Sequence, residues 1–385
     1  MSESHAGLRR MVARDRTQAF RVASPLELLF DLVFVVAVSQ ASDSLHELVS
    51  EGHVAQGALS YLMVFFAIWW AWMNFTWFAS AFDTDDWAYR VMTIAQMGGV
   101  LVLAAGVHDA MATYDLTLVT WGYVIMRLAM VGQWLRAAAS DPASRRTALF
   151  FAVGIAIVQV LWVARLYLLD TTWQFVTFFV LVVAEVMVPV VAERQGRTAW
   201  HPHHIADRYG CFTLIVLGES VLASATAIFQ ARGQGAHVLA LVGLAAAGLA
   251  IAAGMWWLYF EREQGPRLAD IDRGFGFGYA HYVVFAAAGA VSAGIGAGVD
   301  VATGHTALSA STASFVLTVP VAAFMLAMWL VMLRPVVSRA TSAVVIGLAV
   351  LVIVSALVPP ASLAATAVLL ALAVVAVEAD TRHQA

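Results

Sequence analysis

The stretch Ser24–Val38, SPLELLFDLVFVVAV, combines a long apolar run with two carboxylates, Glu27 and Asp31, in its first half. A membrane-spanning helix needs about 20 mainly apolar residues, and this run is suited to one. Glu27 and Asp31 are four residues apart, so a helix places them about 40° apart on one face. A carboxylate at the centre of a bilayer costs about 2.5–3.5 kcal/mol, so it faces the protein interior, a cation or a hydrated path.

The whole chain has the composition of a membrane protein. Of its 385 residues, 62% are hydrophobic and only 12% are charged, whereas soluble domains carry about 25% charged residues. The net charge of −4 and the dispersed arginines argue against nucleic-acid binding. A single cysteine, Cys211, excludes an internal disulfide. No phosphate-binding loop with its lysine and no nucleophile–base pair is present, so we expect neither an enzyme nor a bound cofactor.

The hydrophobic runs indicate twelve candidate spanning helices. They are centred near Phe34, Ala67, Gly99, Ile125, Ile157, Leu181, Val216, Leu249, Gly289, Phe324, Val350 and Val368. We therefore predict an all-α polytopic membrane protein with about 12 transmembrane helices. The number is eleven if Pro359-Pro360 kinks one helix instead of separating two.

The arginines indicate how these helices are oriented. With twelve spans and the N-terminus inside, every arginine except Arg127, Arg165 and Arg232 falls on the cytoplasmic side, as the positive-inside rule requires. Both termini should then be cytoplasmic. Residues 1–22 contain no cleavable signal peptide, and we expect a disordered cytoplasmic N-terminal tail there.

The two halves of the chain carry similar features at nearly the same offset. Asp31 in the first predicted helix corresponds to Glu219 in the seventh, and Trp69-Trp70 corresponds to Trp256-Trp257. Ala95-Gln96 in the third helix likewise corresponds to Ala280-His281 in the ninth. We predict two pseudo-symmetric six-helix repeats of parallel orientation, residues 23–200 and 201–385.

Ionisable residues inside membrane helices are functional candidates. The candidates for an ion or substrate pathway are Glu27, Asp31, Arg127, Arg208, Glu219 and His281. Glu27 could instead be an interfacial carboxylate favoured by the helix dipole, and Asp31 a structural ion pair. Arg208 is either a headgroup anchor or a partner of Glu27. Glu219 lies deep in its helix beside Gly218, which permits close approach of another helix.

Other polar residues leave several interpretations open. The partner of Arg127 could be Asp31, Glu185 or Glu219, although Glu185, near a helix end, is better interpreted as interfacial. His281 could relay protons or be a buried structural histidine. The cluster His201-Pro202-His203-His204 with Asp207 has the composition of a metal site but matches no zinc spacing, so we expect no metal there.

Two motifs resemble those of a known family. Leu26–Val35 resembles the ELFFDLVFV signature of the bacterial low-temperature-requirement protein A family, and Arg208–Glu219 resembles its second signature, an RFGLFTIIVLGE-type run. The resemblance covers nearly the whole chain and departs from the family pattern at Cys211, where an apolar residue is usual. It implies a multi-pass protein of the bacterial cytoplasmic membrane and supplies no activity, substrate or catalytic residue.

The leading functional hypothesis is a secondary transporter coupled to protons or cations. Asp31 and Glu219 would exchange the coupling ion, and Arg127 and His281 would adjust their charge. The alternatives are a passive ion channel lined by the first and seventh predicted helices, or a structural or regulatory membrane protein. The expected partners are membrane lipids and a small solute or ion.

Overall fold

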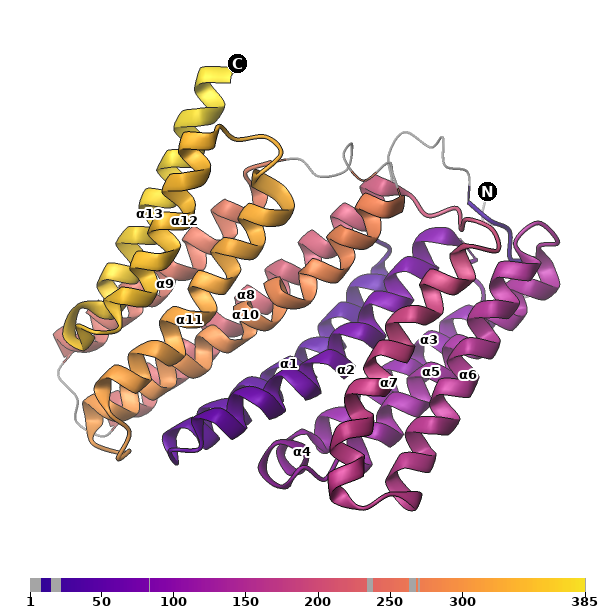
Figure 1. The fold of residues 1–385 in the computed structure, drawn as a ribbon, viewed down its shortest axis with the longest axis horizontal. Helices are drawn as coiled ribbons and strands as arrows, with labels where there is room; N and C mark the ends of the chain where they lie inside the picture. Colours follow the sequence, from indigo (N-terminus) through magenta and orange to yellow (C-terminus); the bar gives the residue numbers. More distant parts are fainter. Residues whose placement is uncertain are drawn as a thin grey trace. The chain divides into compact units, whose positions relative to one another are not determined.

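All named elements of the computed structural model are helices (Figure 1). The structure describes residues 8–14, 22–82, 84–233, 238–262, 268 and 271–384. The helices are α1 (Pro25–Ser50), α2 (Val54–Ala81), α3 (Trp87–Ala105), α4 (Val107–Thr113), α5 (Thr117–Ser140), α6 (Arg145–Leu168), α7 (Thr171–Glu193), α8 (Pro202–Gly233), α9 (Val238–Phe260), α10 (Ile271–Thr303), α11 (Ala310–Met328), the π-helical turn η2 (Trp329–Leu333), α12 (Arg339–Ser355) and α13 (Pro359–Gln384). Within these residues an isolated bridge between Ala13 and Phe82 is the only β-type pairing. The all-α prediction is confirmed.

Each of the twelve predicted segments is centred in a different helix. Ten segments are long and apolar enough to cross a membrane. The other two lie in α5, which carries Arg127, and in α12, which has 17 residues. α12 ends at Ser355 and α13 begins at Pro359, so the two prolines start a new helix instead of kinking one. The chain is a multi-pass helical membrane protein. That α5 and α12 also span the membrane stays a prediction.

Two compact units form by packing, and the division between them runs through α1, α2 and α8. Unit 1 contains Met1–Ala37 and Ala67–Arg208, and unit 2 contains Val38–Phe66 and Tyr209–Ala385. The predicted repeats, 23–200 and 201–385, concern a duplication of the chain, and they stay a prediction.

In unit 1, α3 packs against α5, α5 against α6, and α6 against α7 (Figure 1). Glycines permit the closest of these approaches. A Cβ atom added at Gly122 on α5 would collide with the backbone of Leu103 and lie 2.6 Å from the carbonyl oxygen of Gly99 on α3. Aromatic stacking joins the next pair, because Trp134 on α5 lies 4.1 Å from Phe151 on α6 between ring centroids.

In unit 2, α10 packs against α11, α11 against α12, and α13 against both α12 and α9 (Figure 1). The C-terminal half of α1 and the N-terminal half of α2 are held to α10 by side-chain hydrogen bonds. Ser42 donates to the carbonyl oxygen of Gly289 and Tyr61 to that of Ala286, at 2.8 and 2.9 Å. These bonds lie in a buried environment, where each satisfied polar group avoids a desolvation cost.

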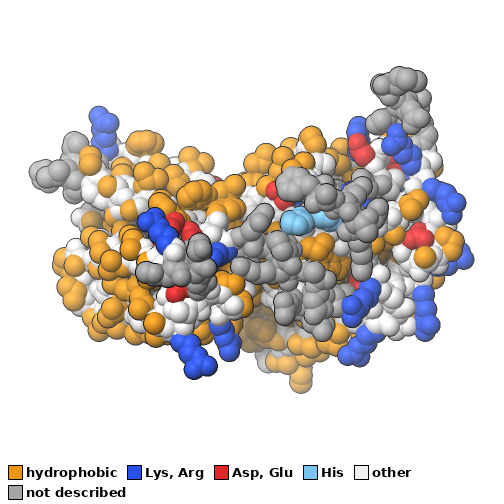
Figure 2. All heavy atoms as spheres, turned by 90° about the horizontal axis from the view of Figure 1, so that it is seen from above, with side chains coloured by type: hydrophobic (Ala, Val, Ile, Leu, Met, Phe, Trp, Pro, Cys, Tyr) orange, Lys and Arg blue, Asp and Glu red, His pale blue; other side chains and the backbone are white. Residues whose placement is uncertain are grey.

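Large apolar side chains remain exposed along many helices. Leu32, Val160 and Leu372 are 52%, 67% and 49% exposed, and Figure 2 shows hydrophobic side chains covering much of the visible surface. Extended apolar surface is unfavourable in water but suits lipid as the solvent. Arginine side chains are visible on the same face, which looks onto the ends of helices (Figure 2).

The N-terminal residues that the structure describes do not form the free tail that we expected. Met11 is fully buried, and the amide of Arg14 donates to the carbonyl oxygen of Ala81 at 3.0 Å. The amide of Arg9 donates to Asp86, which also accepts hydrogen bonds from Arg136. Residues 8–14 are therefore packed on unit 1. The remainder of the predicted tail, 1–7 and 15–21, lies outside the described residues.

Candidate functional site

Glu27 lies in the first turn of α1 and is also part of a buried charge cluster. Its amide bonds to the hydroxyl of Ser24 at 3.3 Å, and its carboxylate accepts from the amide of Ser24 at 2.7 Å. This reciprocal pair is a capping box, and Pro25 occupies the first helical position, where its missing N–H costs nothing. The other carboxylate oxygen lies 3.1 Å from Nε2 of His204 and 3.7 Å from Nη1 of Arg208. Glu27 is only 1% exposed, so its carboxylate is enclosed by the protein.

Asp31 lies one turn further along α1 and pairs with Arg208. Nη2 of Arg208 is 2.5 Å from Oδ1 of Asp31, and the indole Nε1 of Trp72 on α2 donates to the same oxygen at 2.7 Å. Arg208 also lies 3.4 Å from the hydroxyl of Thr76. Both members of the ion pair are fully buried. The sequence hypothesis that Arg208 is a headgroup anchor is wrong, because a fully buried guanidinium cannot reach a headgroup.

We name Glu27, Asp31, His204 and Arg208 the α1–α8 cluster; all four belong to unit 1. Two carboxylates face one guanidinium, so the cluster carries one excess negative charge while the imidazole of His204 is neutral. One proton would bring it to neutrality. Among the described residues, Oδ2 of Asp31 and Nε of Arg208 are buried without a hydrogen-bond partner, so the polar capacity of the cluster is not saturated.

Apolar and polar neighbours enclose the cluster. Phe30, the residue before Asp31, lies 4.7 Å from Phe34 and 4.0 Å from Phe75 between ring centroids, and all three rings are fully buried. Two further ionisable side chains, close in sequence to members of the cluster, bond to backbone amides: Asp207 accepts a hydrogen bond from the amide of Ala23 at 2.8 Å, and Nδ1 of His201 lies 3.4 Å from the amide of His204. Low polarity around charges strengthens every electrostatic interaction among them.

Arg127 belongs to a second cluster, which the sequence did not resolve. Its Nη2 lies 2.9 Å from Oε2 of Glu185, and both side chains are fully buried. Glu185 also accepts hydrogen bonds from Nε1 of Trp70 at 3.0 Å and Nε2 of Gln159 at 2.8 Å. The guanidinium lies 5.7 Å from the ring centroid of Tyr123. Of the three open partners for Arg127, the structure selects Glu185. The interfacial depth of Glu185 stays a prediction.

In unit 2, Glu219 on α8 accepts a hydrogen bond from the hydroxyl of Ser39 at 2.8 Å. Glu219 is half-buried, in contrast to the fully buried carboxylates of unit 1. The expected role of Gly218 is wrong: in the part of the chain that the structure describes, a Cβ atom added there would meet nothing within 4 Å. No helix of the described residues approaches this glycine closely.

His281 on α10 is enclosed by aromatic rings in unit 2. Its Nδ1 lies 2.7 Å from the carbonyl oxygen of Phe277 and its Nε2 2.9 Å from the hydroxyl of Tyr259. The ring centroids of Tyr209 and Phe285 lie 4.7 and 5.2 Å away. The carbonyl requires a proton on Nδ1, and in the neutral imidazole Nε2 then accepts from the hydroxyl of Tyr259. These contacts favour the structural alternative for His281.

Of the histidines in the run 201–204, His201 precedes α8 and His203 and His204 lie in its first turn. His204 faces Glu27, and Asp207 accepts from a backbone amide. Within the described ranges, no group of three or more His, Cys, Asp and Glu side chains lies in a position to hold a metal ion.

Sequence reasoning missed the neutral donors that hold the charges. Trp72 and Thr76 contact the α1–α8 cluster, and Trp70 and Gln159 contact Glu185. One signal was present: Ser24-Pro25-Leu26-Glu27 has the S-x-x-E spacing of a capping box, which predicts a dual role for Glu27. The tryptophans carried no comparable signal, because indoles are common in membrane helices as packing and interfacial groups.

The described residues contain ten long apolar helices with charged side chains buried between them, which define this chain as a polytopic helical membrane protein with an ionisable interior. The chain belongs to the bacterial low temperature requirement A protein (LtrA) family, because the sequence model of that family matches residues 22–378. It is also 29% identical over 280 residues to a protein of Rhizobium meliloti (strain 1021) named uncharacterized protein RA0937. The aligned part covers 70% of this chain and 64% of that relative, so the chain spans less than two thirds of the relative's length.

Proposed function

We propose that the chain is a secondary transporter coupled to protons and that the α1–α8 cluster binds the coupling proton. The observation that carries this proposal is the fully buried arrangement of Glu27, Asp31 and His204 around a single guanidinium, Arg208. Buried ionisable residues in membrane helices mark ion pathways and proton relays. A structural ion pair would need only one carboxylate for one arginine.

The surroundings of the carboxylates favour a proton over a metal cation. Hard metal cations are bound by several oxygen ligands, whereas the carboxylates of this cluster face a guanidinium, an imidazole and an indole N–H. Protonation of His204, Glu27 or Asp31 would remove the excess charge without adding an atom that needs ligands. Glu219 with Ser39 would provide a second, more accessible carboxylate in unit 2.

The location and organisation follow from the arginine distribution and the duplicated features. We assign the chain to the bacterial cytoplasmic membrane with both termini cytoplasmic, twelve transmembrane helices in two six-helix repeats, no enzymatic activity, and a small solute and lipids as partners. Cysteine-scanning accessibility from the two sides of the membrane tests the orientation.

Liposomes that contain a pH-sensitive dye test the coupling. The purified protein is reconstituted, a pH gradient is imposed, and candidate solutes are added singly. Wild-type protein should move protons only with its solute, and Asp31→Asn should abolish this flux. Asp85→Asn is the matched control, because this carboxylate lies in unit 1 but is 53% exposed. Proton flow without any solute would favour the passive channel instead.

Infrared spectroscopy tests proton binding without knowledge of the solute. As the pH falls, wild-type protein should develop a carboxylic-acid carbonyl band or an imidazolium band that Glu27→Gln, Asp31→Asn or His204→Gln removes. If all three variants titrate like wild-type protein, the cluster does not bind a proton and the proposal is wrong.

A further inference from the structure

A groove between α9 and α13 in unit 2 has apolar walls and one polar end. Its volume is about 690 Å³, within the range of about 300–1,000 Å³ that small-molecule sites occupy. The apolar walls are formed by small side chains, mainly Ala250, Ala253 and Gly254 on α9 and Ala371 on α13. Such residues leave a channel along the helices that a flexible hydrocarbon chain fills without displacing side chains.

The polar end of the groove holds two opposite charges and an indole. Nε1 of Trp257 donates to Oε1 of Glu378 at 3.0 Å, and Nη2 of Arg382 lies 3.8 Å from Oε2 of the same carboxylate. Glu378 is 29% exposed and Arg382 82% exposed at their side chains. Both charges are therefore accessible at the mouth of the groove, on successive turns of α13.

This end of the groove lies near the end of α13, beside the start of α12. Asp380 of α13 accepts hydrogen bonds from the amide of Ser338, one residue before α12 begins at Arg339. Tryptophan and arginine side chains are enriched at the headgroup level of a bilayer. The groove thus runs from an apolar depth to a charged, tryptophan-bearing rim.

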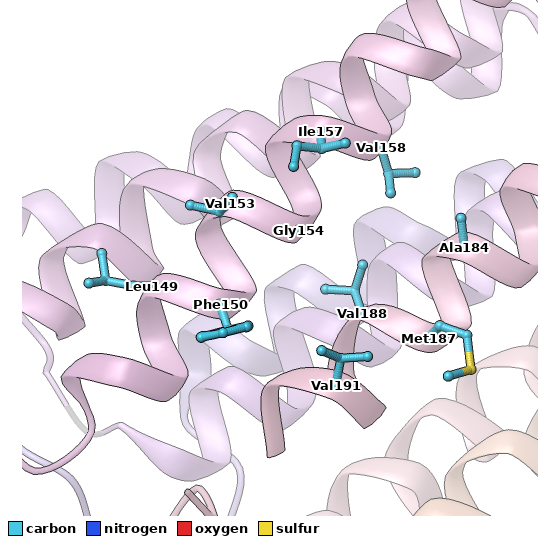
Figure 3. Close-up of a pocket in the computed structure, with 10 residues that line it drawn as sticks. All are labelled: Leu149, Phe150, Val153, Gly154, Ile157, Val158, Ala184, Met187, Val188 and Val191. Carbon is cyan, nitrogen blue, oxygen red and sulfur yellow. The ribbon is translucent and has the colours of Figure 1, made fainter. Parts of the chain in front are cut away.

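A second groove, in unit 1, lacks the charged rim. It lies between α6 and α7 with a volume of about 470 Å³. Figure 3 shows only apolar side chains along it, among them Phe150, Val153, Ala184 and Met187. This groove has the surface of an ordinary lipid contact, and it provides a control of similar shape without headgroup chemistry.

We propose that the α9–α13 groove is a binding site for a zwitterionic phospholipid of the phosphatidylethanolamine type. An acyl chain lies along the alanine-lined walls, the phosphate contacts Arg382, and the ammonium group contacts Glu378. An anionic lipid such as phosphatidylglycerol has no ammonium group to pair with the carboxylate of Glu378, so the two negative charges would repel each other. The proposal does not depend on transport or on the α1–α8 cluster.

Native mass spectrometry of the purified protein, titrated with phosphatidylethanolamine or phosphatidylglycerol, tests the proposal. Wild-type protein should retain more phosphatidylethanolamine than phosphatidylglycerol. Arg382→Gln should weaken its binding about fivefold, the effect of one unit-charge contact at a hydrated site. Glu378→Gln keeps an acceptor for Trp257 and should raise phosphatidylglycerol binding by a similar factor, which removes the preference.

Blocking the groove supplies an independent comparison. Ala253→Phe fills the α9–α13 groove and should abolish the preferential binding, whereas Ala184→Phe in the α6–α7 groove should leave it unchanged. Equal retention of the two lipids by wild-type protein, or equal effects of the two phenylalanine variants, would overturn the proposal. Dimers that disappear in Ala253→Phe would show that a second copy of the chain occupies the groove instead. If Ala253→Phe does not fold, the lipid preferences of Arg382→Gln and Glu378→Gln, at the exposed rim, still test the proposal.

Discussion

Replacing Arg127 by methionine should destabilise unit 1 strongly. The substitution keeps a long side chain of similar volume on α5 and removes only the guanidinium. Glu185 would keep its hydrogen bonds from Trp70 and Gln159 but lose its countercharge, while remaining fully buried. Removing one partner of a buried ion pair typically costs about 3–5 kcal/mol, because an uncompensated charge stays in a low-dielectric interior.

The magnitude converts into a measurable thermal shift. For a unit of about 150–250 residues, 1 kcal/mol lowers the midpoint by about 2–4 °C, so Arg127→Met should lower it by about 6–20 °C. Tryptophan fluorescence recorded on heating in lipid-supplemented detergent, at one scan rate, follows the transition. The matched control is Arg90→Met: Arg90 pairs with Asp85, but their side chains are 50% and 53% exposed. An exposed pair contributes about 0–1 kcal/mol, so this control should shift the midpoint by at most about 4 °C.

A second substitution separates lost charge balance from lost packing. In Arg127→Met with Glu185→Gln, no charge remains, and the new amide accepts from Trp70 and donates to Gln159 once the Gln159 amide flips. The double variant should recover to within about 1–2 kcal/mol of wild-type stability. If Arg127→Met is no worse than Arg90→Met, or if the double variant is as unstable as the single one, the reasoning about this pair is refuted.

Three further predictions concern unit 1. Ser24→Ala removes the hydroxyl of the capping box and should cost about 1 kcal/mol, seen as faster hydrogen exchange in the first turn of α1; unchanged exchange would exclude the cap. Gly122→Ala should cost at least about 1–3 kcal/mol by overpacking against the α3 backbone, whereas Gly98→Ala, with nothing within 4 Å among the described atoms, should not lower the thermal midpoint. Burial alone would raise the pKa of Asp86, but hydrogen bonds from Arg136 and backbone amides lower it below its usual value. This stabilisation is present above the ordinary pKa of an aspartate carboxyl, about 3.9. It is lost as the pH falls through the lower pKa of Asp86 in the folded protein. Asp86→Asn should therefore lose less stability on acidification than wild-type protein.

The positions of the helices could be predicted from the sequence because a bilayer imposes a length and a polarity on each span. Each of the twelve apolar runs coincides with a helix, and the proximity of Glu27 and Asp31 on one face follows from the helical repeat alone. The family membership was likewise predictable, because two local motifs carry it.

The partners of the charges could not be predicted. From the sequence, Arg127 could pair with any of three carboxylates. Glu185 was interpreted as interfacial because the sequence placed it near a helix end. The choice depends on the rotation and depth at which α5, α6 and α7 pack, which many weak contacts set together. Gly218 gives the opposite lesson: a small residue permits a close approach of helices but does not cause one.

The sequence by itself therefore determined the class of protein, the family, the helix positions and the shared helix face of Glu27 and Asp31. Local properties decide all of these, since hydrophobic length, helical spacing and short motifs are readable within a few turns. Only the tertiary structure decided that Asp31 binds Arg208 and Trp72, that Glu185 binds Arg127, Trp70 and Gln159, and that His281 is enclosed by aromatic rings. The physical reason is that these side chains meet across dozens to more than a hundred residues of chain, so packing between helices decides which donor reaches which carboxylate.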